Sequence, residues 1–334
     1  MRYFLLLVFI LTGCQGGYYT GPVSDHFDGK KFYYPGEREK PRSFTRDIYN
    51  IWTAVFQPLW YLPKDVKPYS ICPSQIKGIK ISFINHSTVL IQSKKINVLL
   101  DPIYSYRASP FSWIGPARAH KPGIHFQNLP KIDVVLISHN HYDHMDVSTL
   151  KRLDKALHPL FIVPLGNKIF LKRFAIKNVK ELDWWQEIKI KNTRIHFLPA
   201  HHSTQRWLHD YNYTLWGSYG LQMGDKKIYY AGDTGYANHF KMIRQHWGRP
   251  DFALIPIGAY KPRSLLRVNH IDPFEAVKCH LELGSRLSMG IHWGTFKLSE
   301  ESVNQPAKDL ILAREKLGVS PKAFILPTEI FFKP

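Results

Sequence analysis

Residues 133–146, DVVLISHNHYDHMD, run from an apolar segment directly into a dense group of metal-competent side chains: His139, His141, Asp143, His144 and Asp146. A short apolar run that ends in polar turn residues is typical of a buried β-strand. Side chains two positions apart on an extended segment point the same way, so His139 and His141 can grip one ion. A sharper turn then aims Asp143 and His144 at a neighbouring point. The pattern favours a sheet protein whose strand end carries half of a metal site, and the alternative is a solvated polar loop.

Three later segments offer the partners that such a site needs. PAHH supplies His201 or His202, AGDTG supplies Asp233, and GIHWGTF supplies His292. Each follows a predicted strand, and strand ends can deliver ligands to one rim of a sheet. A lone histidine is more often a core residue than a ligand, but a dense cluster with three later donors indicates a real metal site.

From residue 76 the chain alternates short β-rich runs with amphipathic stretches. The predicted strands are 80–93 (a pair broken by a turn at His86), 97–103, 134–139, 161–166, 194–201, 219–224, 227–233, 252–258 and 288–294. The predicted helices are 148–157, 166–176, 239–247, 272–284 and 305–318. Strands dominate first and helices intersperse later, which indicates an α/β fold with sheets covered by helices on the outside.

We divide the 334 residues into a leader (1–14), an aromatic, proline-punctuated arm (15–75) and a main domain (76–334). The arm should carry a short helix near 47–57 and lie on the main domain. Its aromatic side chains either pack in the core or touch a membrane: Trp52, Phe56, Trp60 and Tyr61.

The leader MRYFLLLVFILTGC has an apolar run too short to span a bilayer, as expected of a secretory signal. Its Leu-Thr-Gly-Cys end resembles a bacterial lipobox, which implies cleavage before Cys14 and acylation of that cysteine. Gln15 would then favour the outer membrane. We therefore expect an exported lipoprotein anchored at the outer membrane or the periplasmic face, with an ordinary signal peptide as the alternative. Cys72 and Cys279 could pair in such a compartment, although two buried free thiols fit a pattern without a disulfide framework better.

The formal net charge of +19 predicts attraction to anionic partners such as phospholipid headgroups, nucleic acid or acidic metabolites. A solvated basic surface is the plain alternative. Nucleic-acid processing is disfavoured because no added basic or RNA-reading domain is evident and because the lipobox exports the chain.

The complete motif set resembles the metallo-β-lactamase superfamily of dinuclear metal hydrolases. Within that superfamily it is similar to the phospholipases D that hydrolyse N-acyl phosphatidylethanolamine. The segments that carry the resemblance are 101–118, 138–146, 199–204, 231–236, 269–277 and 291–296. The resemblance implies an αββα sandwich, in which two mixed β-sheets are flanked by helices.

The resemblance also assigns ligands residue by residue. It implies that one ion is held by His139, His141 and His202, the other by Asp143, His144 and His292, with Asp233 bridging the two. Two Zn²⁺ are expected, although His/Asp sites also accept iron or manganese.

Other residues in the matched motifs receive supporting roles from the resemblance. His270 would lie over the site and serve catalysis, while Asn269 before it departs from the mammalian pattern. Asp101 and His86 would orient ligands, with structural turn residues as the alternative, and His201 would at most support His202.

The implied reaction is hydrolysis of N-acyl phosphatidylethanolamine, or a related phospholipid, to phosphatidic acid and an N-acylethanolamine. A hydroxide bridging the ions would attack phosphorus, with Asp143 and His270 as catalytic residues. Phe111, Trp113 and Trp207 are candidates for an acyl-chain groove or for core packing. The alternative is a lactone, amide or other phosphoester hydrolase on the same scaffold. A membrane surface is the expected partner, reached by the lipid anchor and a basic patch, and a homodimer is left open.

Overall fold

The computed structural model describes residues 18–37, Thr45, Tyr49, 78–207 and 209–327, together with the backbone of 329–332. The predicted leader, most of the predicted helix at 47–57, the arm's four named aromatic residues and Cys72 lie outside these residues. Cys279 is a buried free thiol. No helix among the described residues has both the length and the apolar character needed to cross a bilayer.

The first sheet has the strand order β14-β1-β2-β3-β4-β5-β6. Its strands are β1 (Ile79–Asn85), β2 (Thr88–Gln92), β3 (Asn97–Leu100), β4 (Val134–Leu136), β5 (Leu160–Pro164), β6 (Val179–Leu182) and β14 (Glu329–Phe332). Neighbouring strands from β14 through β1 and β2 to β3 pair antiparallel, and those from β3 through β4 and β5 to β6 pair parallel.

The second sheet repeats this mixture in the order β13-β12-β11-β10-β9-β8-β7. Its strands are β7 (Glu187–Ile190), β8 (Thr193–Leu198), β9 (Ser218–Met223), β10 (Lys226–Tyr230), β11 (Phe252–Pro256), β12 (Leu287–Ile291) and β13 (Phe324–Ile325). Parallel pairing runs from β10 to β13 and antiparallel pairing from β7 to β10.

Successive side chains along each strand point to opposite faces of the sheet, so one face packs in the core between the sheets and the other packs against the outer helices. In β10, Ile228 and Tyr230 enter the core between the sheets, while Tyr229 faces the helices outside. In β4, Val134 and Leu136 face the other sheet and Val135 faces outward. Each sheet is therefore buried on both faces, which explains the nearly continuous apolar runs in the sequence.

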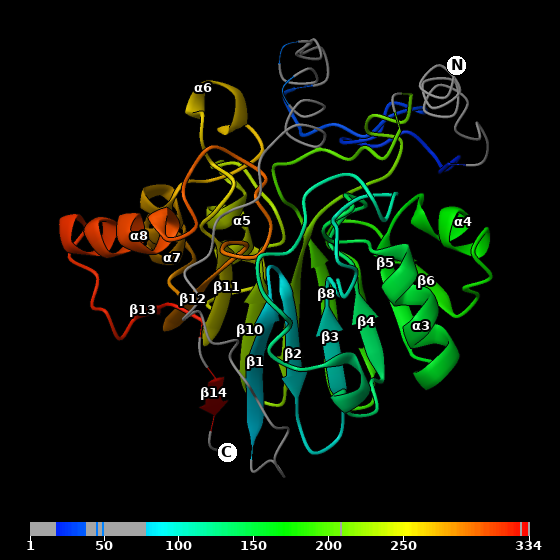
Figure 1. Cartoon of the computed structure of the whole chain (residues 1–334), viewed down its shortest axis with the longest axis horizontal. Helices are drawn as coiled ribbons and strands as arrows, with labels where there is room; N and C mark the ends of the chain where they lie inside the picture. The colour runs from blue at the N-terminus through cyan, green and yellow to red at the C-terminus, as the bar shows by residue number, and fades with distance from the viewer. Residues whose placement is uncertain are drawn as a thin grey trace.

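Helices cover the outer faces, as Figure 1 shows. The helices α3 (Val147–Leu157) and α4 (Asn167–Lys172) pack on the first sheet, and α5 (His239–His246), α7 (Pro273–Leu283) and α8 (Gln305–Lys316) pack on the second. The predicted αββα sandwich of two mixed sheets is confirmed.

The element boundaries correct the predictions in two ways. Several strands end earlier than their apolar runs: β4 stops at Leu136 and β10 at Tyr230, because the chain turns there toward the site. The strands β6, β7, β13 and β14 and the short helices η1 (Phe126–Asn128) and α6 (Arg263–Leu266) were not predicted. β7 alternates exposed and half-buried positions without a strong apolar signal, which explains why it was missed.

Residues 18–37 lie across the loop-bearing end of the sandwich, in blue at the top of Figure 1. Phe27 and Phe32 are buried in the core between the sheets. His26 stacks on Trp184 at 4.5 Å between ring centroids, and the backbone N–H of Phe32 donates to the Asn212 carbonyl. This part of the chain is thus integral to the packed domain.

Candidate metal centre

The predicted ligands lie in loops that follow the carboxyl ends of four strands. His139 comes three residues after β4, His202 four after β8, Asp233 three after β10, and His292 directly after β12. The predicted strands ran up to or into these residues, whereas the observed strands end before them and loops carry the side chains. His292 adopts φ 61°, a left-handed conformation that turns its side chain back toward the cluster.

One group consists of three histidines from two sheets. His139 Nε2 lies 2.9 Å from His141 Nδ1, and His202 Nε2 lies 3.2 Å from the same atom. All three atoms fall within 4.8 Å of one another. Donors bound tetrahedrally at about 2.0–2.1 Å would stand about 3.3 Å apart, so the spacing suits one ion.

The other group combines a carboxylate with two histidines. Asp143 Oδ2 lies 3.3 Å from both His144 Nε2 and His292 Nε2. Both histidines are fully buried, and neither Nε2 atom makes a hydrogen bond within the described part of the chain. Buried polar atoms normally have partners, so these convergent atoms fit a cation between them.

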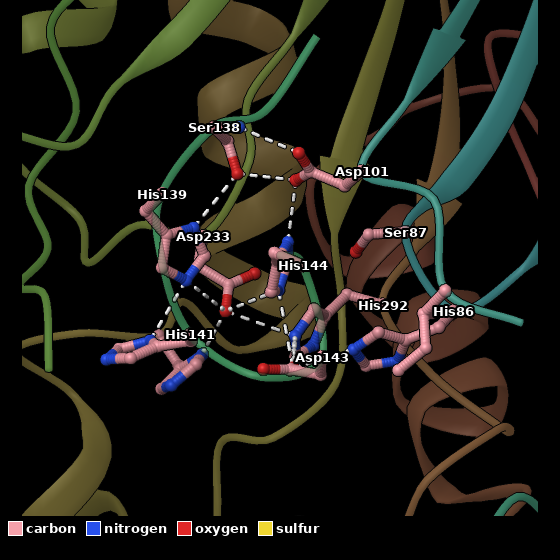
Figure 2. Close-up of polar contacts among 12 residues, drawn as sticks. His86, Ser87, Asp101, Ser138, His139, His141, Asp143, His144, Asp233 and His292 are labelled. Atoms are coloured by element: carbon pink, nitrogen blue, oxygen red, sulfur yellow. Dashed lines mark hydrogen bonds and ion pairs between the residues drawn. The ribbon is translucent and has the colours of Figure 1, made fainter. Parts of the chain in front are cut away.

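Asp233 stands between the two groups, as Figure 2 shows. Its Oδ2 lies 3.2 Å from His144 Nε2 and 3.1 Å from His292 Nε2. The same oxygen lies 3.9 Å from His139 Nε2 and 4.0 Å from His202 Nε2. One carboxylate can therefore reach both groups.

Asp101, which follows β3, fixes a histidine of each group. His144 Nδ1–H donates to Asp101 Oδ2 at 2.6 Å, and the Ser138 hydroxyl donates to the same oxygen at 2.5 Å. That hydroxyl in turn accepts from His139 Nδ1–H at 2.9 Å. Tyr230 OH also donates to Asp101 Oδ2, at 2.5 Å. These contacts direct the Nε2 atoms of both histidines at the cluster, as metal binding requires.

Ser138 and Tyr230 were not predicted to orient ligands. Ser138 directly precedes the ligand motif, and Tyr230 lies in an apolar strand pattern that gives no sign of this contact. Tyr230 is fully buried at the end of β10, two residues before the turn that leads to Asp233. A tyrosine at the last inward position of a strand before a ligand loop is the sequence signal that could have identified it.

His86 contacts one of the predicted ligands. Its Nε2–H donates to Asp143 Oδ2 at 2.8 Å, and its ring lies 4.1 Å from that of His292. His86 also falls within the donor group of Asp143, His144 and His292, so its nitrogen is close enough to act as a further ligand.

His270 lies beside the cluster on the loop between α6 and α7. Its Nδ1 is 3.8 Å from Asp233 Oδ2 and makes no hydrogen bond among the described residues. The Arg263 guanidinium donates to the His270 carbonyl at 2.7 Å and to Glu275 at 2.6 Å. Glu275 belongs to the capping box that starts α7 with Asp272, so the helix start positions this loop.

The same loop also holds His202. The His202 Nδ1–H donates to the Asn269 carbonyl at 2.9 Å, which directs Nε2 to the cluster. A Cβ on Gly235 would stand 2.1 Å from the Val268 carbonyl oxygen, so only glycine permits this approach.

His201 points away from the ligand atoms. Its Nδ1–H donates to the Val268 carbonyl at 2.7 Å, and its Nε2 lies 3.1 Å from Glu37 Oε2. The Tyr34 ring packs edge-on against it at 4.5 Å. His201 thus ties the N-terminal segment to the site wall, and nothing in the sequence signalled this contact.

The predicted groove residues lie at different depths. Trp113 is 57% exposed, with its ring 5.7 Å from that of Phe111. Trp207 is half-buried, and its backbone N–H donates to Asp210. Asp146 falls in none of the donor groups; it occupies the N-cap position of α3 and accepts from the Ser105 hydroxyl.

Burial and charge give the two donor groups different protonation behaviour. Burial, together with neighbouring imidazoles, lowers the pKa of His139 and His202 well below the ordinary value, and burial lowers the pKa of His141 to about 4. Neutral imidazoles present free lone pairs. Burial also lowers the pKa of His270 to about 4 and that of His86 to about 3.

The second group holds protons instead. Burial opposes a charge on His144, but Asp233 and Asp143 outweigh it and raise its pKa well above the ordinary value. Against the same burial, Asp233 helps to raise the pKa of His292 to about 9. Burial favours the protonated form of Asp143 and of Asp233, but the neighbouring His144 keeps the pKa of both carboxyl groups well below the usual range. A cation entering this group would displace those protons.

Similarity to known proteins agrees with the geometry. A family model described as "Beta-lactamase superfamily domain" matches residues 96–293. The chain is 35% identical over 312 residues to N-acyl-phosphatidylethanolamine-hydrolyzing phospholipase D 1 of Caenorhabditis elegans, covering 84% of this chain and 87% of that protein. It is also 35% identical to the mitochondrial N-acyl-phosphatidylethanolamine-hydrolyzing phospholipase D of Saccharomyces cerevisiae, covering 69% of this chain and 50% of that protein.

Among solved structures, isothiocyanate hydrolase from Delia radicum gut bacteria has the same fold, with a TM-score of 0.62 at 16% sequence identity. That alignment covers 76% of this chain and 100% of that chain. At such identity the likeness concerns the fold alone.

Proposed function

Because this chain belongs to the β-lactamase superfamily of metal-dependent hydrolases, we propose that it is a phosphodiesterase of the phospholipase D type. Its substrate would be N-acyl phosphatidylethanolamine or a related phospholipid, and its products phosphatidic acid and an N-acylethanolamine. The family relationship to the Caenorhabditis elegans enzyme supports this substrate class. The observation that carries the proposal is the convergence of two donor groups on one shared carboxylate, Asp233.

The donor set fits two divalent cations, and we assign Zn²⁺ to both. His139, His141 and His202 would hold one ion, Asp143, His144 and His292 would hold the other, and Asp233 would bridge them. Metal ions supply Lewis acidity toward phosphoryl oxygens and lower the pKa of water from 15.7 to about 7. Iron or manganese would also suit nitrogen and oxygen donors.

The chain's own residues would prepare this centre and handle the proton. Asp101 keeps His139 and His144 in the tautomer that exposes Nε2, and His86 holds Asp143 by one oxygen. His270 is neutral at neutral pH because burial lowers its pKa to about 4, so its Nδ1 can accept a proton. In the proposed role, that atom takes the proton of the attacking water and returns it to the leaving oxygen.

We also propose that the enzyme works at a membrane surface. The lipobox-like leader and the net charge of +19 support attraction to anionic phospholipid, since lipid anchoring and basic charge together give stable attachment.

The test is to incubate the purified, zinc-loaded protein with N-acyl phosphatidylethanolamine vesicles and to follow N-acylethanolamine release by mass spectrometry. Release should stop with a chelator and in His139→Ala. A lactone and a chromogenic phosphodiester serve as parallel substrates. Hydrolysis of the lactone alone would favour the alternative hydrolase and reject the lipid substrate.

A further inference from the structure

Arg206 lies four residues after His202, in a loop that faces the segment carrying His139 and His141. Its Nη1 donates to the Asn140 carbonyl at 2.6 Å and to the Met145 carbonyl at 2.9 Å. One guanidinium nitrogen thus bridges the beginning and the end of the turn that presents the ligands.

Aromatic rings cover the same guanidinium. Its central carbon lies 4.1 Å from the centroid of the Tyr142 ring and 5.0 Å from that of Phe170. The Tyr142 hydroxyl donates back to the Arg206 carbonyl at 2.6 Å. A planar guanidinium can stack and donate at once, which a lysine ammonium cannot reproduce.

The loop that carries Arg206 is itself fixed. Asp210 Oδ1 accepts from the backbone N–H of Arg206 at 2.9 Å and of Trp207 at 2.8 Å. Thr204 N–H donates to Asn212 Oδ1, and Asn212 N–H donates to the Thr204 carbonyl. Asn212 has φ 59°, a conformation that asparagine tolerates. The backbone that carries Arg206 is therefore held in place by hydrogen bonds within its own loop.

These contacts join the two sheets at the first donor group. His139 and His141 follow β4 of the first sheet, whereas His202 follows β8 of the second. Their donor atoms must stay about 3 Å apart to share an ion. Besides the core between the sheets, Arg206 links the two ligand segments directly.

We propose that Arg206 is a positioning residue that sets the distance of His202 from His139 and His141, and so the affinity of this group for its ion. The inference rests on the proposed metal site but not on the lipid substrate. Nη1 is directed at two carbonyls of the ligand loop, so Arg206 acts on the position of that loop.

The test compares Arg206→Met and Arg206→Lys with Arg152→Met, since Arg152 also stacks on an aromatic ring, Phe126, at 3.8 Å, but lies on α3, outside the ligand loops. Zinc affinity is measured by chelator competition, and Tm is measured with zinc and with chelator. Partners of metal ligands typically contribute 10- to 100-fold to affinity. We expect Arg206→Met to weaken the binding of one zinc ion at least tenfold and to reduce the rise in Tm that zinc causes. Arg206→Lys should restore little of this affinity, and Arg152→Met should have the zinc affinity of wild type.

A purely structural role would lower Tm by the same amount with and without zinc and leave the affinity unchanged, and that result would overturn the inference. If Arg206→Met fails to fold, Tyr142→Phe keeps the ring and removes only the hydrogen bond to the Arg206 carbonyl. It should weaken zinc binding severalfold, and an unchanged affinity would again overturn the inference. If wild type binds no zinc, the proposed metal centre itself fails, which these data distinguish from failure of Arg206 alone.

Discussion

Two regions of this molecule combine histidine with aspartate in opposite ways. In the metal centre, His139 and His144 each use Nδ1 for a contact that leads to Asp101 and leave Nε2 directed at a shared point. In the N-terminal segment, His26 uses both ring nitrogens, Nδ1 toward Asp25 at 2.6 Å and Nε2 toward Asp183 at 2.8 Å.

The difference distinguishes a binding site from a structural contact. Both ring nitrogens of His26 are hydrogen-bonded to carboxylates, whereas His144 Nε2 makes no hydrogen bond among the described residues. His26 therefore fastens residues 18–37 to the domain. A histidine held by one nitrogen keeps a lone pair in place at little entropic cost when an ion arrives. The stability of the first region should therefore depend on bound metal, and the stability of the second should depend on pH.

The largest expected effect follows from Asp233→Asn. The change removes the charge that both donor groups share, while the side chain keeps its size. We expect hydrolysis to fall by more than about a hundredfold, since even residues that only support metal ligands contribute 10- to 100-fold. Steady-state kinetics and metal content should fall together. Asp183→Asn, which removes a carboxylate from His26, is the matched control and should keep activity within about twofold of wild type.

Asp101→Asn should have the next largest effect. The amide cannot accept from His144 Nδ1, the Ser138 hydroxyl and Tyr230 as a carboxylate does, so His139 and His144 lose their common support. Zinc affinity should drop by about 10- to 100-fold. Tyr230→Phe removes one of these donors and should cost less. Equal zinc affinity in Asp101→Asn and wild type would contradict the role of this network.

Metal removal should separate the two regions by stability. An ion present at about 100 times its Kd stabilises the fold by about 2.7 kcal/mol, so chelator should lower the Tm of wild type by several degrees. His26→Gln should lower Tm by a similar amount with and without metal, because its contacts involve no ligand. Calorimetry measures both. A His26→Gln defect that zinc cancels would erase the distinction between the regions.

The smallest expected effect is a pH dependence of the N-terminal segment. Burial opposes a charge on His26, but Asp183 and Asp25 raise its pKa above the ordinary value of 6.5. The stabilisation is fully present below pH 6.5 and is lost as pH rises through the raised pKa, by less than about 1 kcal/mol. Hydrogen exchange, corrected for its intrinsic pH dependence, should show residues 24–33 losing protection as pH rises. His26→Gln should abolish this change, and a wild-type profile in that variant would refute the assignment.

The sheets covered by helices, and the convergence of the predicted metal ligands, could be predicted from the sequence. The motif 138–146 follows an apolar strand, and its spacing alone indicates that His139 and His141 point together. PAHH, AGDTG and GIHWGTF lie at other strand ends, so a sheet protein has to bring them to one edge.

What the sequence could not provide lies in long-range contacts between ordinary residues. Tyr230 and Ser138 have no metal-binding chemistry of their own, and they matter only because β10 and β4 end beside Asp101. Arg206 belongs to a polar loop whose partners are carbonyl groups, which leave no pattern in a sequence. Weakly apolar edge strands such as β7 were missed because their neighbours, rather than their composition, keep them extended.

The most direct test is a metal count on purified wild-type protein, made by inductively coupled plasma mass spectrometry against a quantified protein concentration. Two ions per chain in wild type, with a loss in Asp233→Asn and none in Asp183→Asn, is the predicted result. A wild-type protein that holds one ion or none after incubation with excess zinc would contradict the shared carboxylate and the two donor groups built around it.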